Sequence, residues 1–124
     1  MQTILVIEDS EQNRVLMRVV LENKGYRVLE ASDGIEGLSM AIALAPDLIL
    51  LDLQMPLMNG FEVIRQLRGN SASRNIKVIA VTSFAMKGDR EKALQAGFDE
   101  YVTKPVDTRR LPELVKQVLS GVCP

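Results

Sequence analysis

The sequence has 124 residues, of which 47% are hydrophobic, enough for one compact domain with its own core and too few for two. We therefore expect a single domain over residues 1–124. Fifteen basic and sixteen acidic residues give a net charge of -1, so the composition offers no general attraction to nucleic acids or anionic membranes. The absence of histidine excludes Ser-His-Asp and Cys-His catalysis, histidine-ligated zinc and phosphohistidine chemistry on this chain.

The sequence contains no segment typical of membrane insertion or secretion. The longest uncharged stretch, Gly37 to Pro46, is about half the length that a membrane-spanning helix needs. The N-terminal segment MQTILVIED has no basic region before its apolar run, unlike a secretory signal. The single cysteine, Cys123, cannot form an internal disulfide, which is consistent with a reducing compartment. We expect a cytoplasmic protein without membrane insertion.

Five short apolar runs alternate with segments of helical periodicity. The predicted strands are TILVI (3–7), YRVLE (26–30), DLILL (47–51), KVIAVT (77–82) and EYVT (100–103). This alternation favours an α/β fold with a doubly wound parallel sheet and helices on both faces. The first, third and fourth runs are the most apolar, and we predict that they form the central strands.

Capping residues mark the ends of several predicted helices. The expected caps are Ser10 or Asp9 for a helix over 11–24 and Asp33 for a helix over 34–44. Asp107 begins the last segment, and Pro112 favours a helix that starts at 111 or 112. The glycines predicted to end helices in the left-handed conformation are Gly25, Gly69, Gly97 and Gly121.

Polar side chains gather where the predicted strands end. The first strand ends in Glu8 and Asp9, the third in Asp52, and the fourth in Thr82 and Ser83, and the fifth runs into Lys104. Each has an ordinary structural explanation alone, as a cap, a turn residue, a strand residue or a solvated lysine. In an open parallel sheet, however, ligands bind beyond the carboxyl ends of the strands. We therefore expect these side chains to share one site.

Three acids in one site require a compensating charge. Two carboxylates about 4 Å apart repel by roughly 4 kcal/mol at an effective dielectric constant near 20. Glu8, Asp9 and Asp52 therefore need either protonation or a cation. A hard divalent ion with oxygen ligands fits best, and Mg²⁺ suits a site with few carboxylates and several waters. Lys104 supplies one further positive charge.

The sequence resembles the response-regulator receiver domains over essentially its whole length. The motifs that carry the resemblance are VIEDS (6–10), DLILLDLQMPLMNGFE (47–62), VIAVTSFA (78–85) and YVTKPV (101–106). A paired acid, a strand-end Asp followed by Met-Pro, a Thr and a Lys-Pro in this order form a specific set. The resemblance implies the flavodoxin-like strand order 2-1-3-4-5.

The resemblance implies a phosphorylation switch centred on Asp52. This residue would accept a phosphoryl group from the phosphohistidine of a sensor histidine kinase or a histidine phosphotransfer protein. Asp9 would bind Mg²⁺ directly, Glu8 would do so through water, and Asp52 and the backbone carbonyl of Gln54 would complete the protein ligands. Lys104 and the metal would neutralise the oxygens of the transferring group.

The resemblance also implies how the signal leaves the site. The acyl phosphate would recruit the Thr82 hydroxyl, and Tyr101 resembles the family's aromatic residue that turns inward. Pro105 follows a cis peptide in similar domains. The altered surface of the fourth and fifth helices and the fifth strand would then regulate a downstream protein target, without direct contact with nucleic acid. A bulky Phe84 would shield the phosphate from water and prolong the phosphorylated state.

The predicted first helix carries more apolar residues than one buried stripe needs. Alignment with the family predicts that Leu16, Val20 and Leu21 face the core. Val15 and Val19 would then form an exposed apolar pair near the acidic site. We interpret this pair as a docking spot for a histidine-bearing helical bundle, although scattered exposed valines are also ordinary.

Alternative functions remain open at this point. A Mg²⁺-dependent phosphohydrolase with an aspartyl-phosphate intermediate would usually carry a second Asp where Gln54 stands, and an insertion that covers its substrate. A receiver-like module that binds partners without phosphorylation is disfavoured by the complete set of site residues. Nucleotide or flavin binding lacks a glycine-rich phosphate loop. The preferred reading is a stand-alone regulator, beginning at Met1, that catalyses only its own phosphorylation and dephosphorylation.

Overall fold

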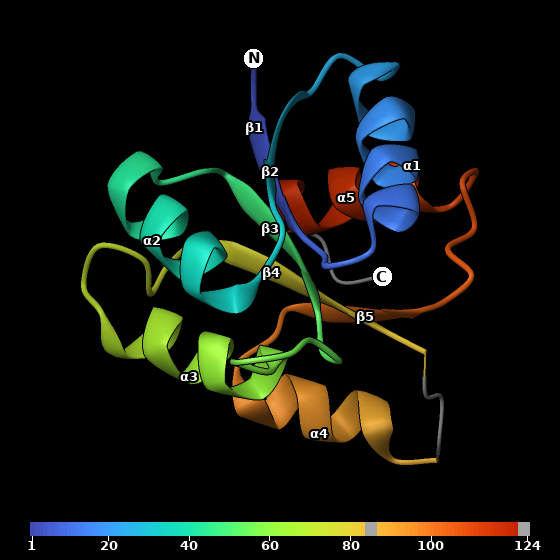
Figure 1. Cartoon of the computed structure of the whole chain (residues 1–124). Coiled ribbons are helices and arrows are strands. Elements are labelled where there is room, and N and C mark those ends of the chain that lie inside the picture. Colours follow the sequence, from blue (N-terminus) through green and yellow to red (C-terminus); the bar gives the residue numbers. More distant parts are fainter. Residues whose placement is uncertain (84–86, 122–124) are drawn as a thin grey trace.

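The computed structural model describes residues 1–83 and 87–121 and has five parallel strands in the order β2-β1-β3-β4-β5 (Figure 1). The strands are β1 Thr3–Ile7, β2 Arg27–Ala31, β3 Leu48–Asp52, β4 Lys77–Thr82 and β5 Glu100–Thr103. The helices are α1 Glu11–Glu22, α2 Gly34–Leu44, α3 Gly60–Gly69, α4 Asp89–Ala96 and α5 Leu111–Ser120. The α/β class, the strand order and the three central strands are confirmed. The predictions made for Phe84 and Cys123 concern residues outside the described ranges.

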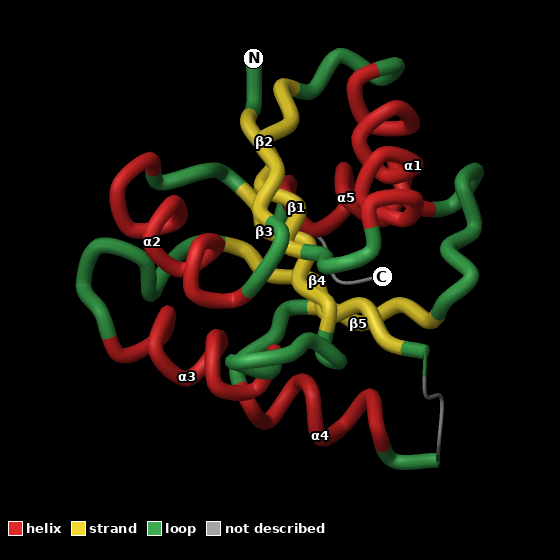
Figure 2. Tube along the Cα trace, in the orientation of Figure 1, coloured by secondary structure: helices red, strands yellow, loops and turns green. Residues whose placement is uncertain are grey.

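Helices cover both faces of the sheet, with α1 and α5 on one side and α2, α3 and α4 on the other (Figures 1 and 2). Alternate residues of each strand point to opposite faces, so the central strands supply two cores. The core under α2, α3 and α4 includes Leu5, Ile49, Val78, Val63 and Leu67. The core under α1 and α5 includes Ile4, Leu50, Ile79, Met17 and Val115. Among the described helices, none is long and apolar enough to cross a membrane.

The register of the parallel strands brings the predicted site residues to one edge. The register pairs Ile7 with Leu51, Asp52 with Val81, and Thr82 with Thr103. Glu8 therefore follows β1 beside Asp52, and Lys104 follows β5 one residue beyond the partner of Thr82. The backbone N–H of Lys104 continues this ladder by donating to the carbonyl of Thr82 at 2.8 Å.

Some predicted element boundaries differ from the structure. β2 and β3 begin and end one residue later than the predicted apolar runs, and β3 ends in Asp52, as predicted. The first helix ends at Glu22, two residues early, because the chain turns there through hydrogen bonds to the carbonyls of Leu21 and Glu22.

The prediction for Gly69 is wrong, whereas the other three glycines have left-handed backbones as predicted. Gly69 is the last residue of α3, and the chain leaves the helix through an extended Asn70. The Asn70 side chain accepts a hydrogen bond from the N–H of Ala72 and stabilises this exit. At the end of α2, Ala45 adopts the left-handed conformation instead, with φ of 46°.

The predicted inward face of α1 is partly wrong. Leu16 is 44% exposed, whereas Met17 and Leu21, four residues apart, are buried against the sheet. Val20 is half-buried. The helix is therefore rotated relative to the predicted orientation, so that Leu16 lies on the same outer face as Val19, which is 53% exposed.

Candidate functional site

Lys104 connects two buried carboxylates at the carboxyl edge of the sheet. Its ammonium nitrogen lies 2.7 Å from Glu8 Oε1 and 3.0 Å from Asp52 Oδ2. The side chains of Glu8 and Asp52 are 0% and 2% exposed. The ammonium of Lys104, at the end of β5, therefore neutralises part of the negative charge of the acids at the ends of β1 and β3.

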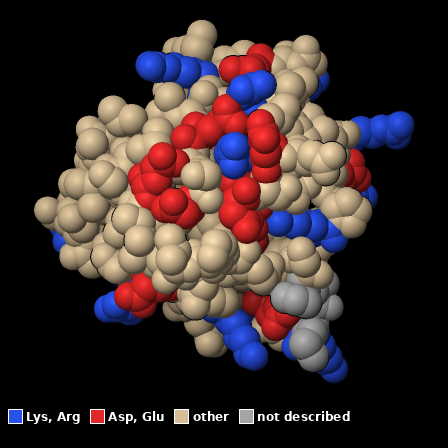
Figure 3. Space-filling view, viewed as in Figure 1, with Lys and Arg blue, Asp and Glu red and all other residues tan. Residues whose placement is uncertain are grey.

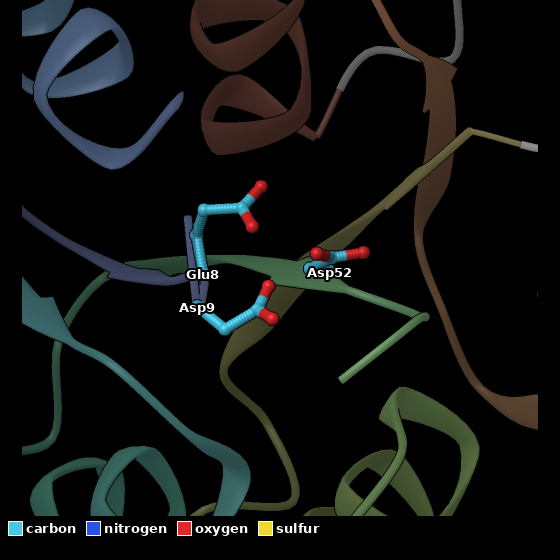
Figure 4. Close-up of side chains that lie close together, drawn as sticks. All are labelled: Glu8, Asp9 and Asp52. Carbon is cyan, nitrogen blue, oxygen red and sulfur yellow. The ribbon is translucent and has the colours of Figure 1, made fainter. Parts of the chain in front are cut away.

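Asp9 adds a third, exposed carboxylate to this pair (Figure 4). One carboxylate oxygen from each of Glu8, Asp9 and Asp52 lies within 4.8 Å of the other two. Acidic side chains also gather, with basic atoms among them, on the face of the molecule seen in Figure 3. Three carboxylates and one ammonium leave an excess of negative charge, and their oxygens are the donors that a hard divalent cation prefers. The residues therefore fit a metal site.

Burial and the neighbouring charges change the pKa values of the groups in this cluster. Burial raises the pKa of Glu8 from 4.5 to about 7, and the neighbouring Asp52 adds to this rise, while Lys104 and the N–H of Ser10 oppose it. Burial also lowers the pKa of Lys104, but its hydrogen bonds with Glu8 and Asp52 more than offset that effect and raise it above its usual value. Lys104 is therefore held as a cation between the two acids.

Backbone contacts fix the turn that carries Glu8. The N–H of Ser10 donates to Glu8 Oε2 at 3.1 Å, and Ser10 also caps α1, as predicted, by accepting from the N–H of Asn13. The guanidinium of Arg14 donates to the Glu8 carbonyl at 2.9 Å and to the Glu30 carboxylate on β2 at 3.2 Å. Arg14 thus joins α1 and β2 to the acidic turn, a role that the sequence analysis missed.

Gln54 connects the loop after β3 to the end of β4. Its backbone N–H donates to Asp52 Oδ1 at 3.0 Å. Its side-chain amide donates to the hydroxyl of Thr82 at 2.7 Å and accepts from the N–H of Ser83 at 3.0 Å. Thr82 is 1% exposed, so this hydroxyl lies inside the site. The sequence analysis assigned a role only to the Gln54 carbonyl and missed its side chain.

Tyr101 and Thr82 both line a small hollow. The hollow has a volume of about 180 Å³, and its walls include Leu53, Gln54, Phe61, Thr82 and Tyr101. Tyr101 is half-buried on β5 and packs against the core under α2, α3 and α4. Burial, followed by the charge of Asp89, raises the pKa of Tyr101 above its usual value. The Lys104–Pro105 peptide bond beyond β5 is cis, as the resemblance implied.

The outer face of α1 presents a shallow apolar surface next to the acids. It is lined by Glu11, Gln12, Val15, Leu16 and Val19. Val15 is half-buried, so the exposed apolar area comes mainly from Leu16 and Val19. Because Ser10 caps this helix directly after Asp9, the surface begins beside the carboxylate cluster.

The fold and this cluster define the class of protein. The chain belongs to the response regulator receiver domain family, whose sequence pattern it matches over residues 4–116. It is therefore a receiver domain of two-component signalling.

Relatives of this chain include the polar-differentiation response regulator DivK of Brucella anthropi and its counterpart in Brucella ovis. Each is 41% identical over 118 residues, which cover 95% of this chain and 96% of the relative.

Solved structures of receiver proteins share the fold. The Vibrio cholerae chemotaxis protein CheY4 has 27% identity and a TM-score of 0.88, with 95% of this chain and 98% of that chain covered. The receiver domain of the sensor histidine kinase PA1611 from Pseudomonas aeruginosa has 34% identity and a TM-score of 0.88, with coverage of 96% and 98%. That structure holds a magnesium ion coordinated in its active-site cleft.

The structure brings together most residues that the sequence analysis assigned to the site. Glu8, Asp9, Asp52 and Lys104 meet at one edge of the sheet, and Thr82 reaches it through Gln54. Tyr101 lines the hollow together with Thr82 and Gln54, and the α1 surface lies outside the cluster.

Proposed function

We propose that this chain is a cytoplasmic, phosphorylation-dependent signalling switch in which Asp52 is the phosphoacceptor. The observation that carries this proposal is the position of Asp52. It is a buried carboxylate at the end of a central strand, with Lys104 at 3.0 Å and the acids Glu8 and Asp9 beside it. A structural acid would be neutralised by the lysine alone, whereas this cluster keeps an excess of negative charge.

The transfer converts the Asp52 carboxylate into an acyl phosphate. One carboxylate oxygen forms a bond to phosphorus while the bond between phosphorus and the donor's imidazole nitrogen breaks. That nitrogen keeps the electron pair, and because the other ring nitrogen of the phosphohistidine carries a proton, the donor leaves as neutral imidazole. We assign the phosphorus donor to the phosphohistidine of a histidine kinase or a histidine phosphotransfer protein, and this histidine must lie on a partner because the chain has none. Lys104 stabilises negative charge on the phosphoryl oxygens during this transfer.

Mg²⁺ is the cofactor that best suits the donor set. Asp9, Glu8 through water, Asp52 and the backbone carbonyl of Gln54 would hold it. When bound, it offsets the charge of the acids and of the phosphoryl oxygens. The magnesium ion in the Pseudomonas aeruginosa receiver structure supports this assignment.

The output of the switch is a change in protein binding. The acyl phosphate carries about -1.5 to -2 charges and strong acceptor oxygens, which attract the hydroxyl of Thr82. A displaced Thr82 changes the wall of the hollow that Tyr101 also lines. The surface of α4, β5 and α5 then binds a downstream protein, and the chain acts on no substrate other than its own phosphoryl group.

The phosphorus donor docks on the outer face of α1. Val15, Leu16 and Val19 provide apolar area directly beside the acidic site. A helical bundle that carries a histidine on its surface would cover these side chains and place that histidine near Asp52. Leu16, which was predicted to face inward, also lies on this face. It enlarges the docking surface beyond the pair of valines.

Incubation with acetyl phosphate and Mg²⁺, followed by intact-mass measurement, tests the function. The wild type is expected to gain one phosphoryl group, and Asp52→Asn is expected to gain none. A wild type that stays unmodified would refute the proposal. Steady release of phosphate from small phosphate esters would instead favour the alternative phosphohydrolase, which the glutamine at position 54 disfavours.

A further inference from the structure

Gln54 uses both ends of its side-chain amide on the end of β4. The nitrogen donates to Thr82 Oγ1 at 2.7 Å, and the oxygen accepts from the N–H of Ser83 at 3.0 Å. Gln54 is otherwise exposed on the loop after β3. Holding a long polar side chain in one rotamer costs entropy, so two simultaneous contacts indicate a defined position for the side chain.

The same residue also touches the phosphoacceptor. Its backbone N–H donates to Asp52 Oδ1 at 3.0 Å. Gln54 therefore contacts Asp52 through its backbone and the Thr82 hydroxyl through its side chain. A change in the position of either Asp52 or Thr82 therefore alters a hydrogen bond of Gln54.

The position of Thr82 Oγ1 links the two contacts, because the Gln54 amide donates to this oxygen in the arrangement seen here, whereas a phosphoryl oxygen would accept from the hydrogen that it carries. If Thr82 rotates so that its hydroxyl donates to new acceptor oxygens on Asp52, Oγ1 moves away from the Gln54 amide. The hollow of about 180 Å³ lined by Gln54, Thr82 and Tyr101 provides space for these side chains to rearrange. The Gln54 amide thus stabilises the arrangement seen here relative to the phosphorylated one.

We propose that Gln54 is a positioning residue that clasps Thr82 and Ser83 in the unphosphorylated arrangement and so sets how readily the switch changes state. This inference rests on the proposed function, because it concerns the response of Thr82 to a phosphoryl group on Asp52. It assigns the glutamine side chain a role of its own in the unphosphorylated protein.

Beryllium fluoride with Mg²⁺, a mimic of a phosphoryl group on aspartate, measures the strength of this clasp. One hydrogen bond shifts an equilibrium by about 2- to 12-fold, so loss of both side-chain contacts removes part of the conformational cost of the switched state. Gln54→Met has a similar volume and no amide, and we expect it to bind beryllium fluoride at least about 5-fold more tightly than the wild type. Gln95→Met, on the exposed face of α4, is the control and keeps the wild-type affinity.

A second background separates positioning from a general structural effect. In Thr82→Val, which keeps the shape of the side chain without the hydroxyl, the gain from Gln54→Met is expected to be smaller, because only the Ser83 contact remains to be lost. An equal gain in affinity in both backgrounds would show that the hydrogen bond between Gln54 and Thr82 does not oppose the switched state. So would a Gln54→Met variant that binds the mimic no more tightly than the wild type.

The outcomes also separate this inference from the proposed function. A wild type that gains a phosphoryl group while Gln54→Met binds the mimic no more tightly overturns only the inference. A wild type that neither gains a phosphoryl group nor binds beryllium fluoride overturns both.

Discussion

The ammonium nitrogen of Lys104 lies 2.7 Å from Glu8 Oε1, although the two residues are at opposite ends of the sequence. The contact spans the sheet from the end of β1 to the end of β5, across the carboxylate of Asp52. In the proposed function, Lys104 has two roles in one position. It offsets the charge of two buried acids, and it lies 3.0 Å from the carboxylate that would accept the phosphoryl group.

Lys104→Met is expected to impair both functions. The cost in free energy of unfolding is about 2–3 kcal/mol, less than the 3–5 kcal/mol of fully buried pairs, because the Lys104 side chain keeps 17% of its exposure. Chemical denaturation without Mg²⁺ measures this change, and phosphorylation by acetyl phosphate should become undetectable. Lys116→Met on the exposed side of α5 is the matched control, with a change below about 0.5 kcal/mol. Equal stability of the two variants would show that Lys104 does not stabilise the acids.

Asp9→Asn separates the metal site from the buried ion pair. Asp9 is exposed, so the substitution relieves repulsion in the cluster without disturbing the contacts of Lys104. At a Mg²⁺ concentration about tenfold above its dissociation constant, binding stabilises the wild type by about 1.4 kcal/mol. Thermal unfolding should show this gain in the wild type and little of it in Asp9→Asn.

The control for the metal site is Glu91→Gln, an exposed acid on α4, which should keep the full Mg²⁺ response. Asp9→Asn should also be slightly more stable than the wild type in the presence of a chelator, because one of three neighbouring charges is gone. A full Mg²⁺ response in Asp9→Asn would mean that the ion binds elsewhere.

Val15→Lys tests the docking surface on α1. A charge placed among apolar side chains is expected to weaken the complex with the phosphohistidine donor and to reduce transfer to Asp52 at least about tenfold. Acetyl phosphate should still label the variant, because the acidic site is unchanged. Radiolabel transfer from a phosphorylated histidine phosphotransfer protein measures the difference.

Ile42→Lys on α2 serves as the comparison, since Ile42 is also an apolar residue, 37% exposed, on another helix. Its transfer rate should equal that of the wild type. If Ile42→Lys slows transfer as much as Val15→Lys does, the donor does not discriminate between α1 and α2.

Substitution by alanine is expected to have opposite effects on stability at two helix glycines. A Cβ at Gly37 would lie 2.4 Å from Cδ1 of Ile7, so Gly37→Ala should destabilise the fold by about 1–3 kcal/mol. A Cβ at Gly69 would have no atom within 4 Å, and the backbone there is not left-handed. Gly69→Ala should therefore stabilise α3 by about 0.5 kcal/mol. Unfolding in urea measures both, and a loss of stability in Gly69→Ala would contradict the second expectation.

The sheet and the acidic edge follow from local sequence signals. The apolar runs over 3–7, 77–82 and 100–103 form strands with the predicted bounds, because short β-branched segments have few alternatives inside a core. The convergence of Glu8, Asp52 and Lys104 follows from placing polar residues at the ends of parallel strands. The order of the strands came from the family resemblance, because sequence periodicity does not specify which strands pair.

Side-chain detail was harder to predict. Successive residues of a helix point about 100° apart, and the prediction placed Leu16 inside instead of its neighbour Met17. The contacts of Gln54 depend on which rotamer reaches Thr82, and the contact of Arg14 with the Glu8 carbonyl depends on a helix packing beside the sheet. The only available signal for Gln54 was its place two residues after Asp52.

The hydrogen bond from the N–H of Lys104 to the carbonyl of Thr82 joins the main chains of two residues to which the proposed function assigns side-chain roles. Rotation about the Cα–Cβ bond of Thr82 leaves that bond intact. The hydroxyl of Thr82 can therefore exchange hydrogen-bond partners while this main-chain hydrogen bond, and with it the alignment of the ends of β4 and β5, is kept.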